Sequence, residues 1–175
     1  SGHLFYGLHF EDKKWIFREW APNATAIYLI GDFNNWEEKP EYRLKKLRNA
    51  IGWEIILPQK ALKHGDLYKL KIYWDGGCGE RIPAWANRVV QDEETKIFSA
   101  QVWAPAKPYK FKKKVFKPNV GPLMIYECHI GMGQDAEKVG TYNEFRENVL
   151  PRVQKDGYNC IQIMAIQEHP YYGSF

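Results

Sequence analysis

The chain has 175 residues, of which 45% are hydrophobic and 15% aromatic, with seven tryptophans and eleven tyrosines. This composition supplies a packed core and excludes the class of disordered, charge-rich chains. The formal net charge is only +4, and the lysines are spread out apart from five between Lys110 and Lys117. Nucleic-acid-binding proteins usually concentrate positive charge on one recognition element, so we interpret this run as a solvated linker and expect no nucleic-acid partner.

The three cysteines, Cys78, Cys128 and Cys160, form neither an even set nor a metal-binding spacing. We therefore expect no metal site and no cofactor, and a reducing, cytoplasmic location fits the cysteines best. No stretch approaches the ~20 consecutive apolar residues of a membrane span, so we expect no membrane partner.

Short aromatic and β-branched runs alternate with turn clusters from residue 14 to about residue 104, which is typical of an antiparallel β-sandwich. Asn34-Asn35 offers a site that tolerates positive φ, and Asp75-Gly76-Gly77 is a hairpin signal. The fold class predicted is therefore mainly β. The predicted strands span residues 15–20, 24–30, 52–57, 68–74 and 97–103.

Side chains alternate with a period of two between residues 68 and 74, so that one set faces the core and Lys69 faces solvent. The same reasoning assigns Trp74 to the core face of this strand. The predicted core residues are Trp20, Leu29, Ile55, Leu70, Ile72 and Val102.

Prolines interleaved with lysines between residues 104 and 122 resist both helix and central strand, so we place a domain boundary there. An apolar strand at 123–129, a helix at 141–154 closed by Gly157, and an apolar strand at 160–166 with both faces covered then predict one β-α-β unit. The predicted organisation is a sandwich domain at 1–104, a linker at 105–121 and the β-α-β unit at 122–175.

Several segments resemble known proteins. Residues 17–24 (FREWAPNA) and 31–36 (GDFNNW) are similar to the opening of carbohydrate-binding module family 48, an immunoglobulin-like domain. Debranching enzymes and the glycogen-binding subunit of a protein kinase share that module. Residues 81–92 (RIPAWANRVVQD), 126–132 (YECHIGM), 148–162 (NVLPRVQKDGYNCIQ) and 165–175 (AIQEHPYYGSF) narrow the resemblance to 1,4-α-glucan (glycogen or starch) branching enzymes.

The resemblance implies an immunoglobulin-like sandwich followed by the start of a glycoside hydrolase family 13 (β/α)8 barrel. Its members cleave an α-1,4 glucan and transfer the segment to a 6-hydroxyl, which is retaining chemistry with an Asp nucleophile and a Glu acid/base roughly 5 Å apart. In this family those carboxylates lie on the fourth and fifth barrel strands. We therefore assign no catalytic residue here, and expect the chain alone to be inactive and its partners to be α-glucan and the remainder of the barrel.

The resemblance also suggests site residues. Trp36 matches a stacking tryptophan and Lys69 a hydrogen-bonding lysine of the glycogen-binding module, whereas Trp85 is an undecided second platform. The loop after the second barrel strand leaves a C-terminal strand end, where barrel active sites form. It would bring four side chains toward the glucan cleft: Glu168, His169, Tyr171 and Tyr172. The alternative is that Glu168 and His169 pin the loop through hydrogen bonds.

Two other functions compete with a branching-enzyme fragment. A stand-alone glycan-binding or targeting protein would have no use for the β-α-β unit. A debranching enzyme shares both module and barrel, but the Pro83-Ala84-Trp85 segment and residues 168–172 favour branching.

Overall fold

The computed structural model describes residues 1–48, 52–112, 117, 121–164 and 166. The chain divides into two compact units, residues 1–109 and residues 110–175. The finer division into a sandwich domain at 1–104, a linker at 105–121 and a unit at 122–175 stays a prediction.

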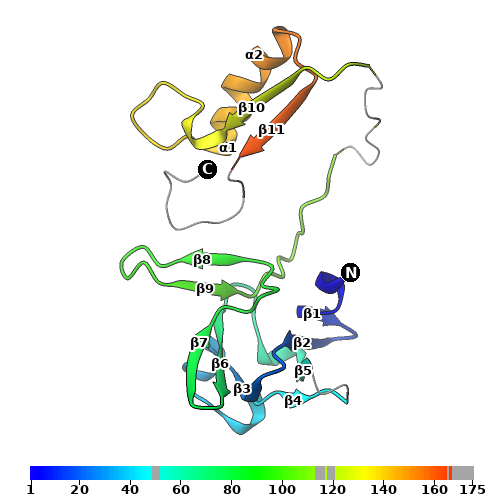
Figure 1. Ribbon diagram of the computed structural model, residues 1–175, viewed down its shortest axis with the longest axis vertical. Helices are drawn as coiled ribbons and strands as arrows, with labels where there is room; N and C mark the ends of the chain where they lie inside the picture. Colours follow the sequence, from blue (N-terminus) through cyan, green and yellow to red (C-terminus); the bar gives the residue numbers. More distant parts are fainter. Residues whose placement is uncertain (49–51, 113–116, 118–120, 165, 167–175) are drawn as a thin grey trace. The chain divides into compact units, whose positions relative to one another are not determined.

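The first unit contains two antiparallel sheets (Figure 1). One sheet has the strand order β1-β2-β5-β4, with β2 paired along its whole length to β5 from Lys14↔Pro58 to Trp20↔Gly52. Its strands are β1 (Gly7–Glu11), β2 (Lys14–Trp20), β4 (Lys45–Lys46) and β5 (Gly52–Pro58).

The second sheet has the order β3-β6-β9-β8, and β7 also pairs with β6. One edge of β6 therefore serves two strands in succession. It pairs with β9 at Leu67 and Tyr68, and with β7 from Leu70 onward. The strands are β3 (Ala24–Gly31), β6 (Leu67–Trp74), β7 (Gly77–Arg81), β8 (Val89–Gln91) and β9 (Phe98–Gln101).

The sandwich confirms the predicted fold class, and all five predicted strands are present, although the last is shorter than expected. Both turn predictions hold, because Asn35 has φ 58° and the turn after Trp74 joins β6 to β7. Four strands were not predicted, namely β1, β4, β7 and β8. They are short or rich in glycine and charged residues, which weakens the alternation that marks a strand.

The core lies between the two sheets. Four of the six predicted core residues are confirmed, because Leu29, Leu70 and Val102 are almost fully buried and Ile55 is buried as well. Ile72 is only partly buried and packs against the core. Trp20 was predicted wrongly, because its side chain is 55% exposed.

The error at Trp20 comes from a buried carboxylate. In β2 the inward positions are Trp15, Phe17 and Glu19, which puts Trp20 on the outer face. Glu19 is only 3% exposed, and its two carboxylate oxygens accept hydrogen bonds from the backbone N–H of Trp20 at 2.9 Å and of Ala84 at 3.1 Å. Burial raises the pKa of Glu19. This residue therefore ties the loop after β7 to β2.

Replacing Glu19 with alanine should lower the free energy of unfolding of the first unit by about 1 to 3 kcal/mol, because both N–H groups lose their acceptor. All seven tryptophans lie within residues 1–109, so tryptophan fluorescence during urea unfolding reports on this unit. Glu11→Ala, at an exposed position of β1, is the control. Equal stabilities for Glu19→Ala and Glu11→Ala would contradict this role.

The second unit is the predicted β-α-β arrangement. Strand β10 (Ile125–His129) pairs in parallel with β11 (Cys160–Met164). The helix between them comprises α1 (Tyr142–Glu144), a π-helical turn at 145–149 and α2 (Leu150–Lys155). The wide turn ends just before Pro151, which lacks a backbone donor and disfavours regular helix geometry in the preceding turn. Among the described residues, no helix is long and apolar enough to cross a bilayer.

The two strands are less enclosed than the sequence suggests. Phe145 and Cys128 form a small buried cluster with Ile130. Ile161 and Ile163 nevertheless remain 36% exposed, and Ile125 is 49% exposed. The expectation of a strand covered on both faces is therefore wrong for the residues described. Gly157 does end the helix with φ +91°, as predicted.

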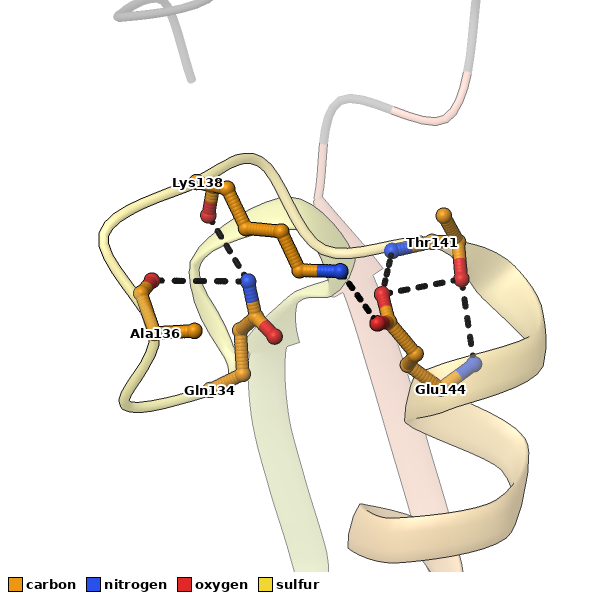
Figure 2. A network of polar contacts seen from close by, with 5 residues as sticks. All are labelled: Gln134, Ala136, Lys138, Thr141 and Glu144. Carbon is orange, nitrogen blue, oxygen red and sulfur yellow. Dashed lines mark hydrogen bonds and ion pairs between the residues drawn. The ribbon is translucent and has the colours of Figure 1, made fainter.

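The start of the helix is held by a local polar network (Figure 2). The Thr141 hydroxyl accepts from the Glu144 N–H at 3.2 Å, and the Glu144 carboxylate accepts from the Thr141 N–H at 2.8 Å, which is a capping box. The Lys138 ammonium contacts the same carboxylate, while Gln134 donates to the Lys138 carbonyl at 2.7 Å. The contacts from Lys138 and Thr141 lower the pKa of Glu144 to about 2, with the Lys138 hydrogen bond as the largest cause.

The Glu144 carboxyl should therefore titrate near pH 2 in a carbon-detected NMR experiment. The ionised Glu144 carboxylate stabilises the helix start, and this contribution is complete above pH 4.5, the ordinary pKa of the group. It is lost as the pH falls toward 2 and the carboxylate becomes protonated. Lys138→Ala should raise the pKa of Glu144, whereas Lys155→Ala, at the far end of the helix, should leave it unchanged. An unaltered titration in Lys138→Ala would show that the ion pair does not form.

Candidate functional site

Trp36 and Lys69 lie in one open hollow on the second sheet, which we call the β6 hollow. It has a volume of about 850 Å³. Lys69 occupies the position where the edge of β6 changes partner from β9 to β7, so the divergence of these strands opens the surface there. Polar side chains from the surrounding strands and loops complete the lining, among them Asp32, Glu80, Arg88, Gln91, Asp92 and Gln101.

A tight turn after β3 places Trp36. Asn35 and Trp36 both have positive φ, at 58° and 60°. The buried Asn34 side chain holds the turn, since its Oδ1 accepts from the Gly31 N–H at 2.9 Å and its Nδ2 donates to the Leu29 carbonyl at 3.0 Å. The Trp36 side chain is consequently directed outward and is 37% exposed.

Asp32 connects this tryptophan to the start of β6. One of its carboxylate oxygens accepts from the Trp36 indole N–H at 3.0 Å, and the other accepts from the Leu67 N–H at 2.7 Å. The indole is therefore oriented relative to the strand that carries Lys69. This arrangement restricts the ring before any ligand is bound.

Lys69 is a restrained cation, because its ammonium group lies 3.6 Å from the Glu80 carboxylate and its side chain is 15% exposed. On the opposite strands, Arg88 donates to the Gln101 side-chain oxygen at 2.7 Å, and Gln101 donates to the Gly65 carbonyl at 3.1 Å. The hollow thus combines one flat aromatic ring with ordered donors and acceptors. That combination suits a polyhydroxylated ligand with an apolar face.

The turn between β8 and β9 is held by Asp92 at the rim of the hollow. Its carboxylate accepts from the Thr95 N–H and the Thr95 hydroxyl, each at 2.7 Å, and these bonds lower the pKa of Asp92. Asp92 is therefore committed to the turn. Among the described residues, no group of three or more His, Cys, Asp or Glu side chains is arranged to hold a metal ion.

Trp85, the third predicted carbohydrate-binding residue, lies outside this hollow. Trp85 stacks on Tyr6, with ring centroids 6.1 Å apart and planes at 17°, and its backbone oxygen lies against Gly7. The remaining predicted site residues lie outside the described part of the chain: Glu168, His169, Tyr171 and Tyr172.

A second aromatic surface was missed by the sequence analysis. Trp20 and Trp74 line a mainly apolar hollow of about 320 Å³ together with Pro22 and Ile72, which we call the Trp20 hollow. Trp74, predicted as core, is only half-buried, and the Arg81 guanidinium lies 5.4 Å from its ring centroid. Strict alternation of side chains along β2, starting from a buried Trp15, would have predicted that Trp20 faces outward. That prediction also requires a charged residue, Glu19, in the core.

Comparison with known proteins gives matches over the whole chain. The model of the family carbohydrate-binding module 48 (isoamylase N-terminal domain) matches residues 5–93. The chain is 41% identical over 184 residues to a 1,4-alpha-glucan-branching enzyme of Dictyostelium discoideum, covering 100% of this chain and 26% of that protein. It is also 41% identical to the 1,4-alpha-glucan-branching enzyme 2-2, chloroplastic/amyloplastic, of Arabidopsis thaliana, covering 99% of this chain and 22% of that protein.

This chain thus spans about a quarter of the length of these relatives. Among solved structures, it resembles a pullulanase from Bacillus acidopullulyticus with a TM-score of 0.73 and 16% identity over 97% of this chain and 22% of that one. It also resembles a pullulanase from Anoxybacillus sp. LM18-11 complexed with maltotetraose, with a TM-score of 0.69 and 20% identity over 96% of this chain and 26% of that one.

The likeness to the pullulanases establishes the fold, and the family match identifies the first unit. Because the family model covers about half of the residues and the resemblance seen in the sequence agrees with it, this chain belongs to the carbohydrate-binding module 48 family.

Proposed function

We propose that this chain is the glucan-binding and scaffolding part of a 1,4-α-glucan-branching enzyme, which cleaves α-1,4 glucan and forms α-1,6 branches. Support comes from the roughly 40% identity to branching enzymes across the whole chain, both units included. The likeness to pullulanases concerns fold alone, so it does not favour debranching. The three free cysteines fit action in a reducing cytoplasm.

The β6 hollow is the proposed glucan site. The main support for this proposal is that Trp36 and Lys69 line the same surface. The indole would stack on the apolar face of one glucose unit, while Lys69 and the Arg88–Gln101 pair would bind hydroxyl groups. One stacked aromatic contributes on the order of 1 to 2 kcal/mol, so without a second platform the affinity should be near-millimolar.

Titration of maltoheptaose into the chain, followed by NMR or calorimetry, tests this site. Trp36→Ala should weaken binding about tenfold, since the stacking contact is lost, and Lys69→Ala should weaken it as well. Trp85→Ala is the matched control, because Trp85 lies outside the hollow. If Trp36→Ala binds like the unaltered chain while Trp20→Ala does not, the sugar binds at the Trp20 hollow instead.

The second unit is the proposed beginning of the catalytic barrel, with β10 and β11 as its first two strands. The incomplete enclosure of Ile125, Ile161 and Ile163 supports a role as a scaffold for further strands. By the resemblance, the segment at 167–175 would reach the glucan cleft through Glu168, His169, Tyr171 and Tyr172.

This 175-residue chain should show no branching activity on its own, because in the family the nucleophile and the acid/base lie on the fourth and fifth barrel strands. Incubation with amylose followed by NMR detection of α-1,6 linkages checks this, with a complete branching enzyme as the positive control. Reproducible branching by the purified chain would refute the assignment.

A further inference from the structure

A group of basic side chains surrounds a different hollow, on the first sheet, that the proposed function does not use. The whole chain has a formal net charge of +4, and the six residues from Arg43 to Arg48 alone carry four basic side chains and no acidic one. The rest of the chain is therefore balanced in charge. The segment around strand β4 therefore carries a local excess of positive charge.

This surface, which we call the β4 hollow, has a volume of about 380 Å³. Arg43, Lys45 and Lys46 line it together with Glu41 and Glu54. The same three cations also line an adjoining hollow beside Thr25 and Trp53.

The backbone places these cations reproducibly, because the segment is fastened to both sheets. Lys45 and Lys46 pair with Glu54 and Trp53 of β5, whereas Arg43 forms a bridge with Tyr28 of β3. Aromatic rings restrain two of the side chains. The Arg43 guanidinium lies 5.7 Å from the Tyr28 ring centroid, and the Lys46 ammonium lies 5.1 Å from that of Trp53, both within cation–π range.

The local carboxylates do not balance this charge. Glu54 is bonded to Arg18 at 2.6 Å, which leaves Glu41 as the other acid in the lining. Within the described part of the chain, no Asp or Glu oxygen lies within ion-pair distance of Arg43, Lys45 or Lys46. Side chains alternate along a strand, so Arg43 and Lys45, two positions apart on either side of the buried Leu44, lie on one face, whereas Lys46 lies on the face of Trp53. A planar guanidinium and an ammonium group side by side are complementary to the oxygens of a compact dianion.

We propose that the β4 hollow binds a phosphate monoester or free phosphate, with Arg43 and Lys45 as the contacting groups. Binding falls as ionic strength rises, because the cations are exposed and screened by salt. The alternative is that lysines on the short edge strand β4 only prevent sheet-to-sheet association. This site is separate from the β6 hollow and does not depend on glucan binding.

The test is NMR titration of the whole chain at low salt with three probes: inorganic phosphate, glucose 6-phosphate and glucose. Both phosphate probes should shift amide signals around β4, and glucose should not. Tighter binding of glucose 6-phosphate identifies a sugar phosphate as the ligand, whereas equal binding identifies free phosphate. Equal shifts with glucose, or no saturable shift with either phosphate, would overturn the proposal.

Charge variants separate this site from general attraction. Arg43→Gln and Lys45→Gln should each weaken phosphate binding about fivefold to tenfold, whereas Glu41→Gln should strengthen it. Lys60→Gln makes the same charge change outside the hollow and should have little effect. If Lys60→Gln weakens binding as much as Lys45→Gln, or if Lys45→Gln causes self-association with unchanged binding, the site does not exist.

Discussion

Phe17 of β2 and Tyr68 of β6 meet edge to face between the two sheets, with ring centroids 6.3 Å apart. Both side chains are at most 2% exposed, and burial raises the pKa of the Tyr68 hydroxyl. Since side chains alternate along a strand, this contact sets which residues of both strands face solvent. Lys69 and Trp20 are directed outward because Tyr68 and Phe17 are directed inward.

The outward direction of Lys69 in the β6 hollow and of Trp20 in the Trp20 hollow therefore follows from one packing contact. A one-residue shift of β6 would turn Lys69 toward the core and Leu70 toward solvent, which would bury a charge and expose an apolar side chain. Trp36 depends on a different element, the turn held by Asn34. The proposed glucan site consequently joins a residue positioned by core packing with one positioned by a locally bonded turn.

The basic surface at β4 has another origin. The segment from Arg43 to Lys46 connects to both sheets, so its charges lie at the edge of the sandwich, where water screens them. Both this surface and the β6 hollow surround ordered cations. They differ in that Lys69 has the nearby carboxylate of Glu80, whereas the β4 cations have none at ion-pair distance among the described residues. The first environment suits neutral hydroxyl groups and the second suits an anion.

The sequence by itself determined features that depend on neighbouring residues: the alternating strands, the positive-φ turn at Asn35, the β6–β7 hairpin and the helix end at Gly157. It also placed Trp36 and Lys69 among the candidate site residues. Only the tertiary structure decided the orientation of Trp20, because Glu19 is buried with an N–H donor from Ala84, 65 residues away. It likewise decided that Trp85 packs on Tyr6 and that β7 and β9 share one edge of β6. Such contacts join distant residues, and the energy that selects them comes from packing and desolvation, which no local pattern records.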